Sequence, residues 1–247
     1  MLLNFFESDL ASNYDLMRVK NAHIETIDPK RDVEIVLMHG WHSLYSPMKT
    51  LENAFRERIP HARLWRTTYD SHWKTFSQSA RQINGLLKDE GVKPENTLLI
   101  GYSMGGVVCR SMVDNGFEAR GLISLCSPHL GAAPWMPAGD IGSWSIAPWS
   151  SRLARLNRSK RDLARRDDYF FQAITFTDAS GYCRHDRIVA QRSALGYGLK
   201  GEMERYTTKL DYKGLAHDCQ PHIQGMNPNC LDEAMEWAQQ KMEAKSS

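Results

Sequence analysis

The stretch "LLIGYSMGGV", residues 98–107, decides how this sequence is interpreted, because Ser103 stands between two glycines directly behind an apolar run. Glycine and serine are common turn residues, so the pattern G-x-S-x-G alone arises often by chance. Here the residues before Ser103 are typical of a buried strand, and residues 104–115 have helical spacing. Ligands bind beyond the carboxyl ends of the strands in an open parallel sheet. The surroundings therefore favour a functional serine over an ordinary turn residue.

Apolar strand-like runs alternate with helical periods on both sides of this stretch. Strands are predicted over residues 33–40, 62–69, 97–103, 120–127, 170–176 and 205–212. Helices are predicted over residues 46–59, 76–90, 104–115 and 231–242. Parallel neighbours in a sheet need such crossover helices, so the alternation predicts an α/β fold with a mostly parallel sheet flanked by helices on both faces.

One segment, residues 133–168, interrupts the alternation. It carries three tryptophans and three prolines and then a strongly basic stretch, Arg152 to Arg166. A structureless insertion of this length is uncommon in a compact domain, so we expect a partly helical cap or lid on a single domain that spans residues 1–247. The basic stretch suggests contact with an acidic membrane or nucleic acid. Because Asp162, Asp167 and Asp168 reduce its charge, the sequence favours a solvated cap helix instead.

Composition narrows the class of protein. The chain has 42% hydrophobic and 24% charged residues and a formal charge of +2, which indicates a globular protein not adapted to nucleic acid. It has no apolar run of about 18 residues that could span a bilayer. Its first residues include acids, whereas a signal peptide needs a basic start and an uninterrupted apolar stretch. We therefore expect a cytoplasmic protein. The five cysteines form no C-x-x-C pair and the histidines no H-E-x-x-H motif, so we expect reduced cysteines, no metal and no cofactor.

Four motifs occur in a fixed order along the chain. They are "VLMHGWHS" (36–43), "GYSMGG" (101–106), "LCSPHLGA" (125–132) and "HDRIVAQRSAL" (185–195). Together they resemble the motifs of α/β-hydrolases of the lipase and carboxylesterase type. This resemblance implies the α/β-hydrolase fold with a cap insertion, and it makes Ser103 the nucleophile of a strand-to-helix elbow.

The resemblance also implies an oxyanion hole made of two backbone N–H groups. One belongs to Met104, the residue after the nucleophile, and the other to Trp41, which follows the pair His39-Gly40. His39 itself is expected to be structural rather than catalytic.

A serine nucleophile needs a general base and an acid that orients it. In the family that this chain resembles, the acid corresponds to Asp186 in "HDRIV", with Asp178 as the competitor. Two histidines qualify as the base: His217, which we favour because it follows the last strand through a short turn, and His222, at the distance from the final helix that shorter lipases show. His129 precedes the acid, so we expect it to pack against the site or form its wall.

These parts predict a serine hydrolase that cleaves carboxylic esters through a Ser-His-Asp triad and an acyl-enzyme. The substrate is expected to be a small-molecule ester or a lipid, with a transient membrane-surface contact through the cap. A thioesterase or amidase would use the same residues, because the leaving group alone differs. A non-catalytic relative of the same fold, which binds a ligand or partner, is the alternative from another class.

Overall fold

The computed structural model describes residues 22–26, 33–41, 45–132, 140–212 and 220–243. Its strands are β1 (His23–Thr26), β2 (Val33–Met38), β3 (Ala62–Thr68), β4 (Thr97–Tyr102), β5 (Gly121–Leu125), β6 (Tyr169–Asp178), β7 (Gly181–Cys183) and β8 (Glu204–Asp211). The helices outside the cap are α2 (Tyr45–Arg58), α3 (Phe76–Asp89), α4 (Met104–Asp114), α8 (Gln191–Ala194), α9 (Gln220–Gln224) and α10 (Asp232–Glu243), with short 3₁₀ turns at Pro94–Asn96 and Pro228–Cys230.

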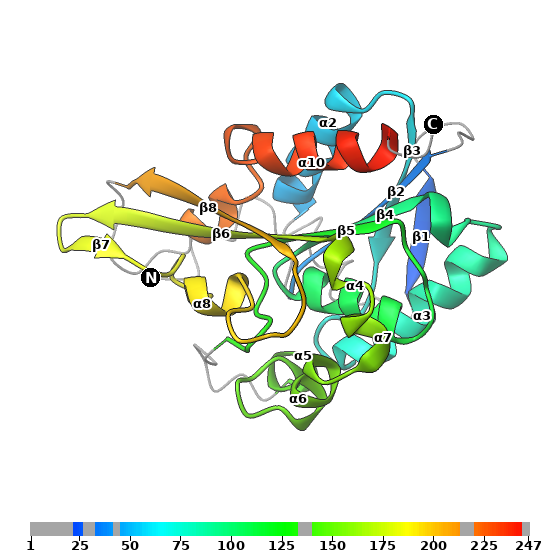
Figure 1. The fold of residues 1–247 in the computed structure, drawn as a ribbon, viewed down its shortest axis with the longest axis horizontal. Coiled ribbons are helices and arrows are strands. Elements are labelled where there is room, and N and C mark those ends of the chain that lie inside the picture. Colours follow the sequence, from blue (N-terminus) through cyan, green and yellow to red (C-terminus); the bar gives the residue numbers. More distant parts are fainter. Residues whose placement is uncertain (1–21, 27–32, 42–44, 133–139, 213–219, 244–247) are drawn as a thin grey trace.

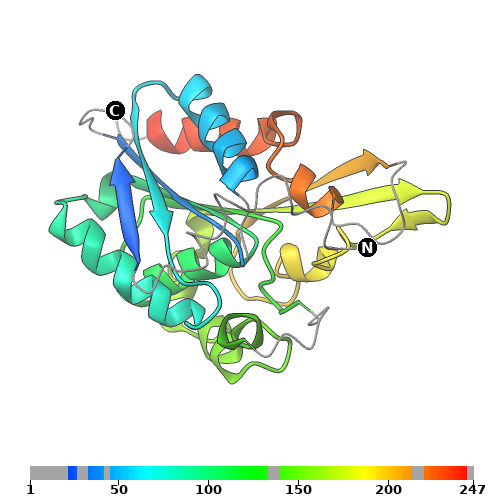
Figure 2. The same cartoon turned by 180° about the vertical axis from the view of Figure 1, so that it is seen from behind.

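The strands form one eight-stranded sheet. Its order is β1-β3-β2-β4-β5-β6-β7, and β8 also pairs with β6. Strands β3, β2, β4, β5, β6 and β8 run parallel, whereas β1 and β7 pair antiparallel with β3 and β6. The predicted mostly parallel sheet is confirmed. Figures 1 and 2 show α2 and α10 on one face of the sheet and α3 and α4 on the other.

Both faces of the central strands are buried, which explains why these strands are continuously apolar rather than alternating. On β2, Ile35 and Leu37 belong to the core cluster that includes the apolar residues of α2 and α10. Their neighbours Val36 and Met38 belong to the cluster with α3 and α4. Successive side chains of a strand point to opposite faces, so a single strand supplies both cores.

The cap consists of three short helices, α5 (Ile141–Ser145), α6 (Ser151–Asn157) and α7 (Lys160–Leu163), and a 3₁₀ turn at Arg166–Asp168. Each helix begins at a side chain that accepts a backbone N–H bond: Asp140, Ser150 and Ser159. Such caps are needed because the first N–H groups of a helix have no partner within it. The described part of the segment between β5 and β6 is thus partly helical.

The expectation that the acids of the cap offset its surface charge is wrong for Asp162, which is fully buried, whereas Asp167 is exposed and Asp168 is half-buried. The carboxylate of Asp162 binds two arginines inside the protein instead of facing solvent.

Four short elements were not predicted: β1, β7, α8 and α9. Each has five residues or fewer, too few for a hydrophobic period to identify it. Among the described residues, no helix combines the length and the apolar character that crossing a membrane requires.

Candidate active site

Ser103 occupies the sharp turn between β4 and α4. Its backbone has φ 53° and ψ −125°, a region that side-chain-bearing residues rarely adopt and that is found where structure enforces it at functional sites. The turn is held against β5 by the Ser103 N–H, which donates to the carbonyl of Leu125 at 2.8 Å. The strand and the helix approach so closely that a Cβ on Gly101 would overlap the backbone of Gly105 and Gly106. This is the geometry that exposes a serine hydroxyl at the end of a strand.

The turn that follows β2 lies against this serine. A Cβ on Gly40 would stand 2.8 Å from the Cβ of Ser103 and 3.4 Å from its Oγ, so only glycine fits there without a shift. Trp41 is the next residue in this turn, and its indole Nε1 donates to the Asp140 carboxylate of the cap at 3.1 Å. Met104 is the first residue of α4, so its N–H has no acceptor within the helix. The two expected oxyanion donors, Trp41 and Met104, therefore directly follow Gly40 and Ser103 in the chain.

His39 is buried beneath this turn. Its Nδ1 lies 2.7 Å from the carbonyl of Gly40, and its Nε2 accepts the N–H of Tyr69 at 3.2 Å. Its ring stacks on Tyr69 at 4.0 Å between centroids. Burial lowers the pKa of His39 to about 4, so the ring is neutral and Nδ1 donates. Both ring nitrogens are thus used to hold the Gly40 turn, which is a structural role.

Asp186 and His222 form a buried pair. The Oδ2 of Asp186 lies 2.7 Å from Nδ1 of His222, while its Oδ1 accepts the N–H groups of Ile188 at 2.9 Å and Val189 at 2.6 Å. Both residues are buried. The His222 ring packs on Tyr102, the residue before Ser103, with 5.0 Å between ring centroids. A carboxylate fixed in this way selects the imidazole tautomer with a proton on Nδ1, which leaves Nε2 to act as a base.

The competing candidates fare differently. His217 lies outside the described residues. Asp178 is at the end of β6, where it accepts from Ser180 and pairs with Arg187 at 3.0 Å rather than with a histidine. Of the two candidate acids, only Asp186 meets one of the candidate bases among the described residues.

Cys126 is a neighbour of this pair that the sequence analysis did not single out. The potential ligand atoms of Cys126, Asp186 and His222 all lie within 4.8 Å of one another. Burial, followed by the charge of Asp186, raises the pKa of the Cys126 thiol well above its usual value. A metal ion would need the thiolate form of Cys126, and it would compete with the hydrogen bond between Asp186 and His222. These three residues are therefore better suited to proton transfer than to metal binding. The sequence feature that could have identified Cys126 is its position in "LCSPHLG", directly after β5.

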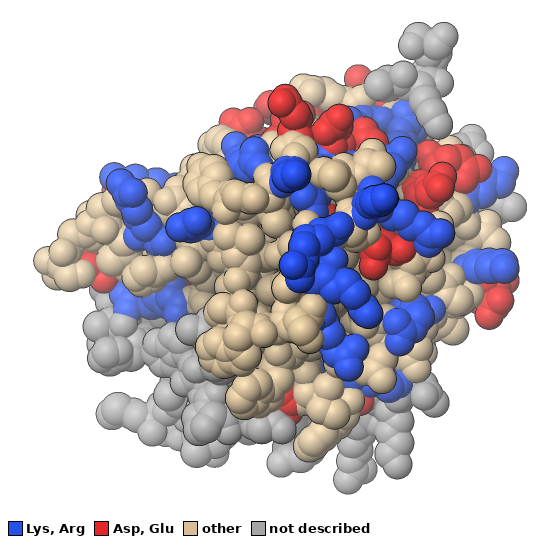
Figure 3. Space-filling model, turned by 60° about the horizontal axis from the view of Figure 1, so that its bottom comes forward, with Lys and Arg blue, Asp and Glu red and all other residues tan. Residues whose placement is uncertain are grey.

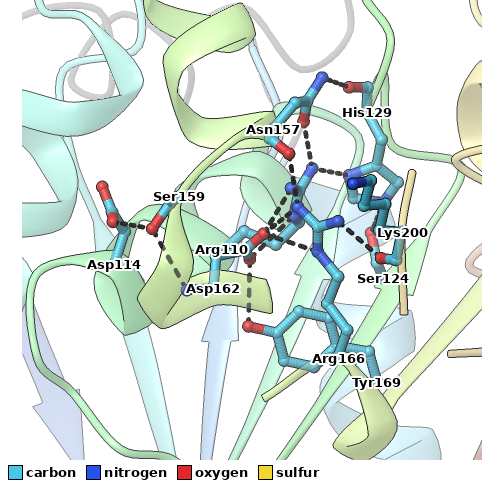
Figure 4. A network of polar contacts seen from close by, with 10 residues as sticks. All are labelled: Arg110, Asp114, Ser124, His129, Asn157, Ser159, Asp162, Arg166, Tyr169 and Lys200. Atoms are coloured by element: carbon cyan, nitrogen blue, oxygen red, sulfur yellow. Dashed lines mark hydrogen bonds and ion pairs between the residues drawn. The ribbon is translucent and has the colours of Figure 1, made fainter. Parts of the chain in front are cut away.

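A buried polar network joins the cap to the elbow helix (Figure 4). Arg110 of α4 and Arg166 of the cap both bind the carboxylate of Asp162, with nitrogen–oxygen distances of 2.7 and 2.6 Å. Arg110 also reaches Nδ1 of His129 at 3.3 Å, and His129 contacts the hydroxyl of Ser124 through Nε2 at 2.9 Å. Burial, together with the charges of both arginines, lowers the pKa of His129 well below its usual value. His129 is therefore neutral, and its ring also stacks on Phe171 at 3.9 Å between centroids.

The model of the palmitoyl protein thioesterase family matches residues 34–175 of this chain. Among solved structures, the mature lipase BlEst2 of Bacillus licheniformis is similar over 87% of this chain and 96% of its own, with 14% identity and a TM-score of 0.61. The esterase Pf2001 of Pyrococcus furiosus (90% and 88% covered, 14% identity, TM-score 0.57) and the carboxylesterase CesB of Bacillus subtilis (94% and 95% covered, 10% identity, TM-score 0.53) are similar as well. No curated protein matches the chain. These similarities show the α/β-hydrolase fold.

Proposed function

This chain belongs to the palmitoyl protein thioesterase family, and on this premise we propose that it is a serine hydrolase that cleaves carboxylic esters with Ser103, His222 and Asp186. The observation that carries the proposal is the buried contact between Asp186 and His222, whose ring packs on the residue before Ser103. His222 replaces the sequence-based preference for His217 as the base in this proposal.

In the proposed reaction, the Ser103 hydroxyl attacks the acyl carbonyl while Nε2 of His222 takes its proton. Asp186 holds the other ring nitrogen and stabilises the imidazolium that forms. The developing oxyanion accepts hydrogen bonds from the backbone N–H groups of Trp41 and Met104. His222 then returns the proton to the departing alcohol, and a water molecule activated by the same histidine releases the acid from the acyl-enzyme.

A thioester is the second candidate substrate, and the family match favours it. Thioester and ester hydrolysis proceed through the same acyl-enzyme, so the two differ in the leaving group and not in the triad. A panel of p-nitrophenyl esters beside acyl-coenzyme A thioesters of the same chain lengths would decide between them. A kcat/KM at least about tenfold higher on thioesters would assign the thioesterase.

The triad is tested by single substitutions. Ser103→Ala and His222→Ala should each lower kcat on a p-nitrophenyl ester by about 10⁴-fold or more, because triad residues act as a unit. His217→Ala is the matched control and should retain most of the activity. Circular dichroism confirms that each variant is folded, and a fluorophosphonate probe should label the wild type but not Ser103→Ala.

Two outcomes would count against these assignments. Full activity in Ser103→Ala, together with no labelling of the wild type, would favour a non-catalytic binding protein. Activity that survives His222→Ala but is lost in His217→Ala would return the role of base to His217.

A further inference from the structure

Helices α6 and α7 of the cap present cations to solvent, and Asp167, which is also exposed, lies in the 3₁₀ turn that follows them. The exposed charged residues between positions 140 and 166 are all basic, namely Arg152, Arg155, Arg158, Lys160 and Arg161. The two acids in this range are buried: Asp140 is 8% exposed and Asp162 is not exposed at all. The five cations form no ion pair with any residue in the described part of the chain. Arg161 does contact Asp114 of α4, but through the backbone carbonyl.

The burial of Asp162 creates this imbalance. Its carboxylate is shared between Arg110 and Arg166, both of which are themselves buried. In the sequence, Asp162 appears to offset the charge of the basic stretch. In the structure, its carboxylate instead pairs with arginines inside the protein. Figure 3 brings this side of the molecule forward and shows Lys and Arg gathered near the middle of the face, with an uncharged area on one side and an acidic group on the other.

Large apolar side chains are exposed on α5, on α7 and in the turn between α5 and α6. Trp144 is 53% exposed and Trp149 62%, and their rings meet edge-on at 6.1 Å between centroids. Ile141 is 48% exposed, and Leu163 37%. Clustered apolar groups of this size on a surface mark an interaction site more often than chance exposure does. Tryptophan in particular prefers the interface between water and the lipid headgroups.

We propose that the cap docks on the surface of an anionic lipid membrane. The exposed arginines and lysine provide the electrostatic attraction, and Trp144, Trp149 and Ile141 enter the interface. Single-stranded nucleic acid also attracts cations and aromatic rings, but it uses rings as stacking platforms. Exposed aliphatic side chains such as Ile141 and Leu163 gain nothing from a base and do gain from burial among acyl chains, so the lipid surface fits better.

The position of the cap gives docking a consequence for the site. Asp140, which caps α5, accepts the indole N–H of Trp41 in the turn beside Ser103. A membrane bound to α5 and α6 therefore lies next to the elbow. Docking itself does not depend on the proposed hydrolysis, because the residues that carry it are separate from Ser103, His222 and Asp186.

Vesicle sedimentation of the full chain tests the proposal. The wild type should bind vesicles of phosphatidylcholine mixed with phosphatidylglycerol at least about tenfold more tightly than vesicles of phosphatidylcholine alone, and added salt should weaken this binding. Arg152→Glu with Arg155→Glu should lower binding by about tenfold or more, and Trp144→Ala with Trp149→Ala should also lower it. Lys88→Glu with Lys93→Glu changes two exposed cations outside the cap and should bind as the wild type does.

Ser103→Ala separates docking from catalysis, since it should bind vesicles as the wild type does even though it lacks activity. The proposal is overturned if anionic and neutral vesicles bind equally. It is also overturned if both cap variants, folded by circular dichroism, bind as the wild type does, or if a single-stranded oligonucleotide binds more tightly than anionic vesicles.

Discussion

At the scale of single residues, Asp162 is a fully buried carboxylate that links the cap to α4. It accepts hydrogen bonds from Arg110, Arg166 and the Tyr169 hydroxyl. Although burial raises its pKa, the two neighbouring guanidinium groups hold the pKa of Asp162 below its usual value. Removing one partner of a buried ion pair is costly because it leaves the other charge uncompensated.

Asp162→Asn keeps the shape of the side chain and removes its charge. We expect the free energy of unfolding to fall by about 3–5 kcal/mol, because two buried guanidinium groups lose their counter-charge. Urea denaturation followed by circular dichroism measures this loss. Glu118→Gln, on an exposed side chain, is the control and should stay within about 0.5 kcal/mol of the wild type. A loss below about 1 kcal/mol in Asp162→Asn would show that neutral acceptors alone satisfy the arginines.

The sequence predicted some site residues better than others, for physical reasons. Ser103 was recognisable because its strand, glycines and helix are neighbours in the chain, so local order reflects local geometry. The partner of Asp186 was harder to identify, because His217 and His222 both follow the last predicted strand. His222 contacts Asp186 although the two residues are 36 positions apart in the chain. That contact depends on α9, a five-residue helix without a recognisable period.

At the scale of elements, the elbow depends on the close approach of β4 to α4. Gly101→Ala would push a Cβ into the backbone of Gly105 and Gly106, which no side-chain rotation relieves. We expect this variant to be less stable and to lose about 10²-fold or more in kcat, because the nucleophile is displaced. The matched substitution is Gly85→Ala in α3, where a new Cβ meets nothing within 4 Å.

Gly85→Ala should raise the free energy of unfolding by about 0.5–1 kcal/mol, since alanine favours a helix interior over glycine. Thermal denaturation and the ester assay are measured on both variants. Equal stability and activity in the two would contradict the close approach that the elbow geometry implies.

The helices and central strands could be predicted from their buried residues. These residues are apolar, and they either recur at helical spacing or form a continuous run in a strand. In α3, the buried residues Phe76, Ala80, Ile83 and Leu87 follow the helical period, and the Thr75–Gln78 capping box marks its start. Strand β1 could not be predicted in this way, because most of "HIET" is exposed and the strand exists through its pairing with β3. An edge strand of four residues carries too little apolar pattern to be distinguished from a loop.

At the scale of the whole molecule, the charge of the outer surface could not be read from the sequence. The chain has a formal charge of +2, and the basic stretch of the cap includes acids. Which of these charges face water depends on tertiary contacts between segments far apart in the chain, such as Asp162 with Arg110. The sequence therefore could not show that Asp162 is buried and adds no negative charge to the surface.

Global stability should depend on pH through the buried histidines. The pKa of His39 is about 4 in the folded protein, against an ordinary value of 6.5, because burial disfavours the charged ring. Between these two values the unfolded chain binds a proton that the folded protein does not, so stability is full above about pH 6.5 and falls as the pH drops. From pH 7 to pH 5, His39 alone should cost about 2 kcal/mol of unfolding free energy. The pKa of His129 is also lowered, by burial and by the charges of two arginines, which adds a loss of the same sign.

Urea denaturation at a series of pH values between 7 and 5 measures this dependence. His39→Asn removes one titrating group, so its unfolding free energy should change less over this range than that of the wild type, whatever its absolute stability. His61→Asn replaces an exposed histidine and should leave the slope unchanged. If wild-type stability were flat from pH 7 to pH 5, the unfolded chain would gain no proton that the folded protein excludes. The ring of His39 would then be charged or open to solvent, and it could not hold the Gly40 turn as an acceptor for the Tyr69 N–H.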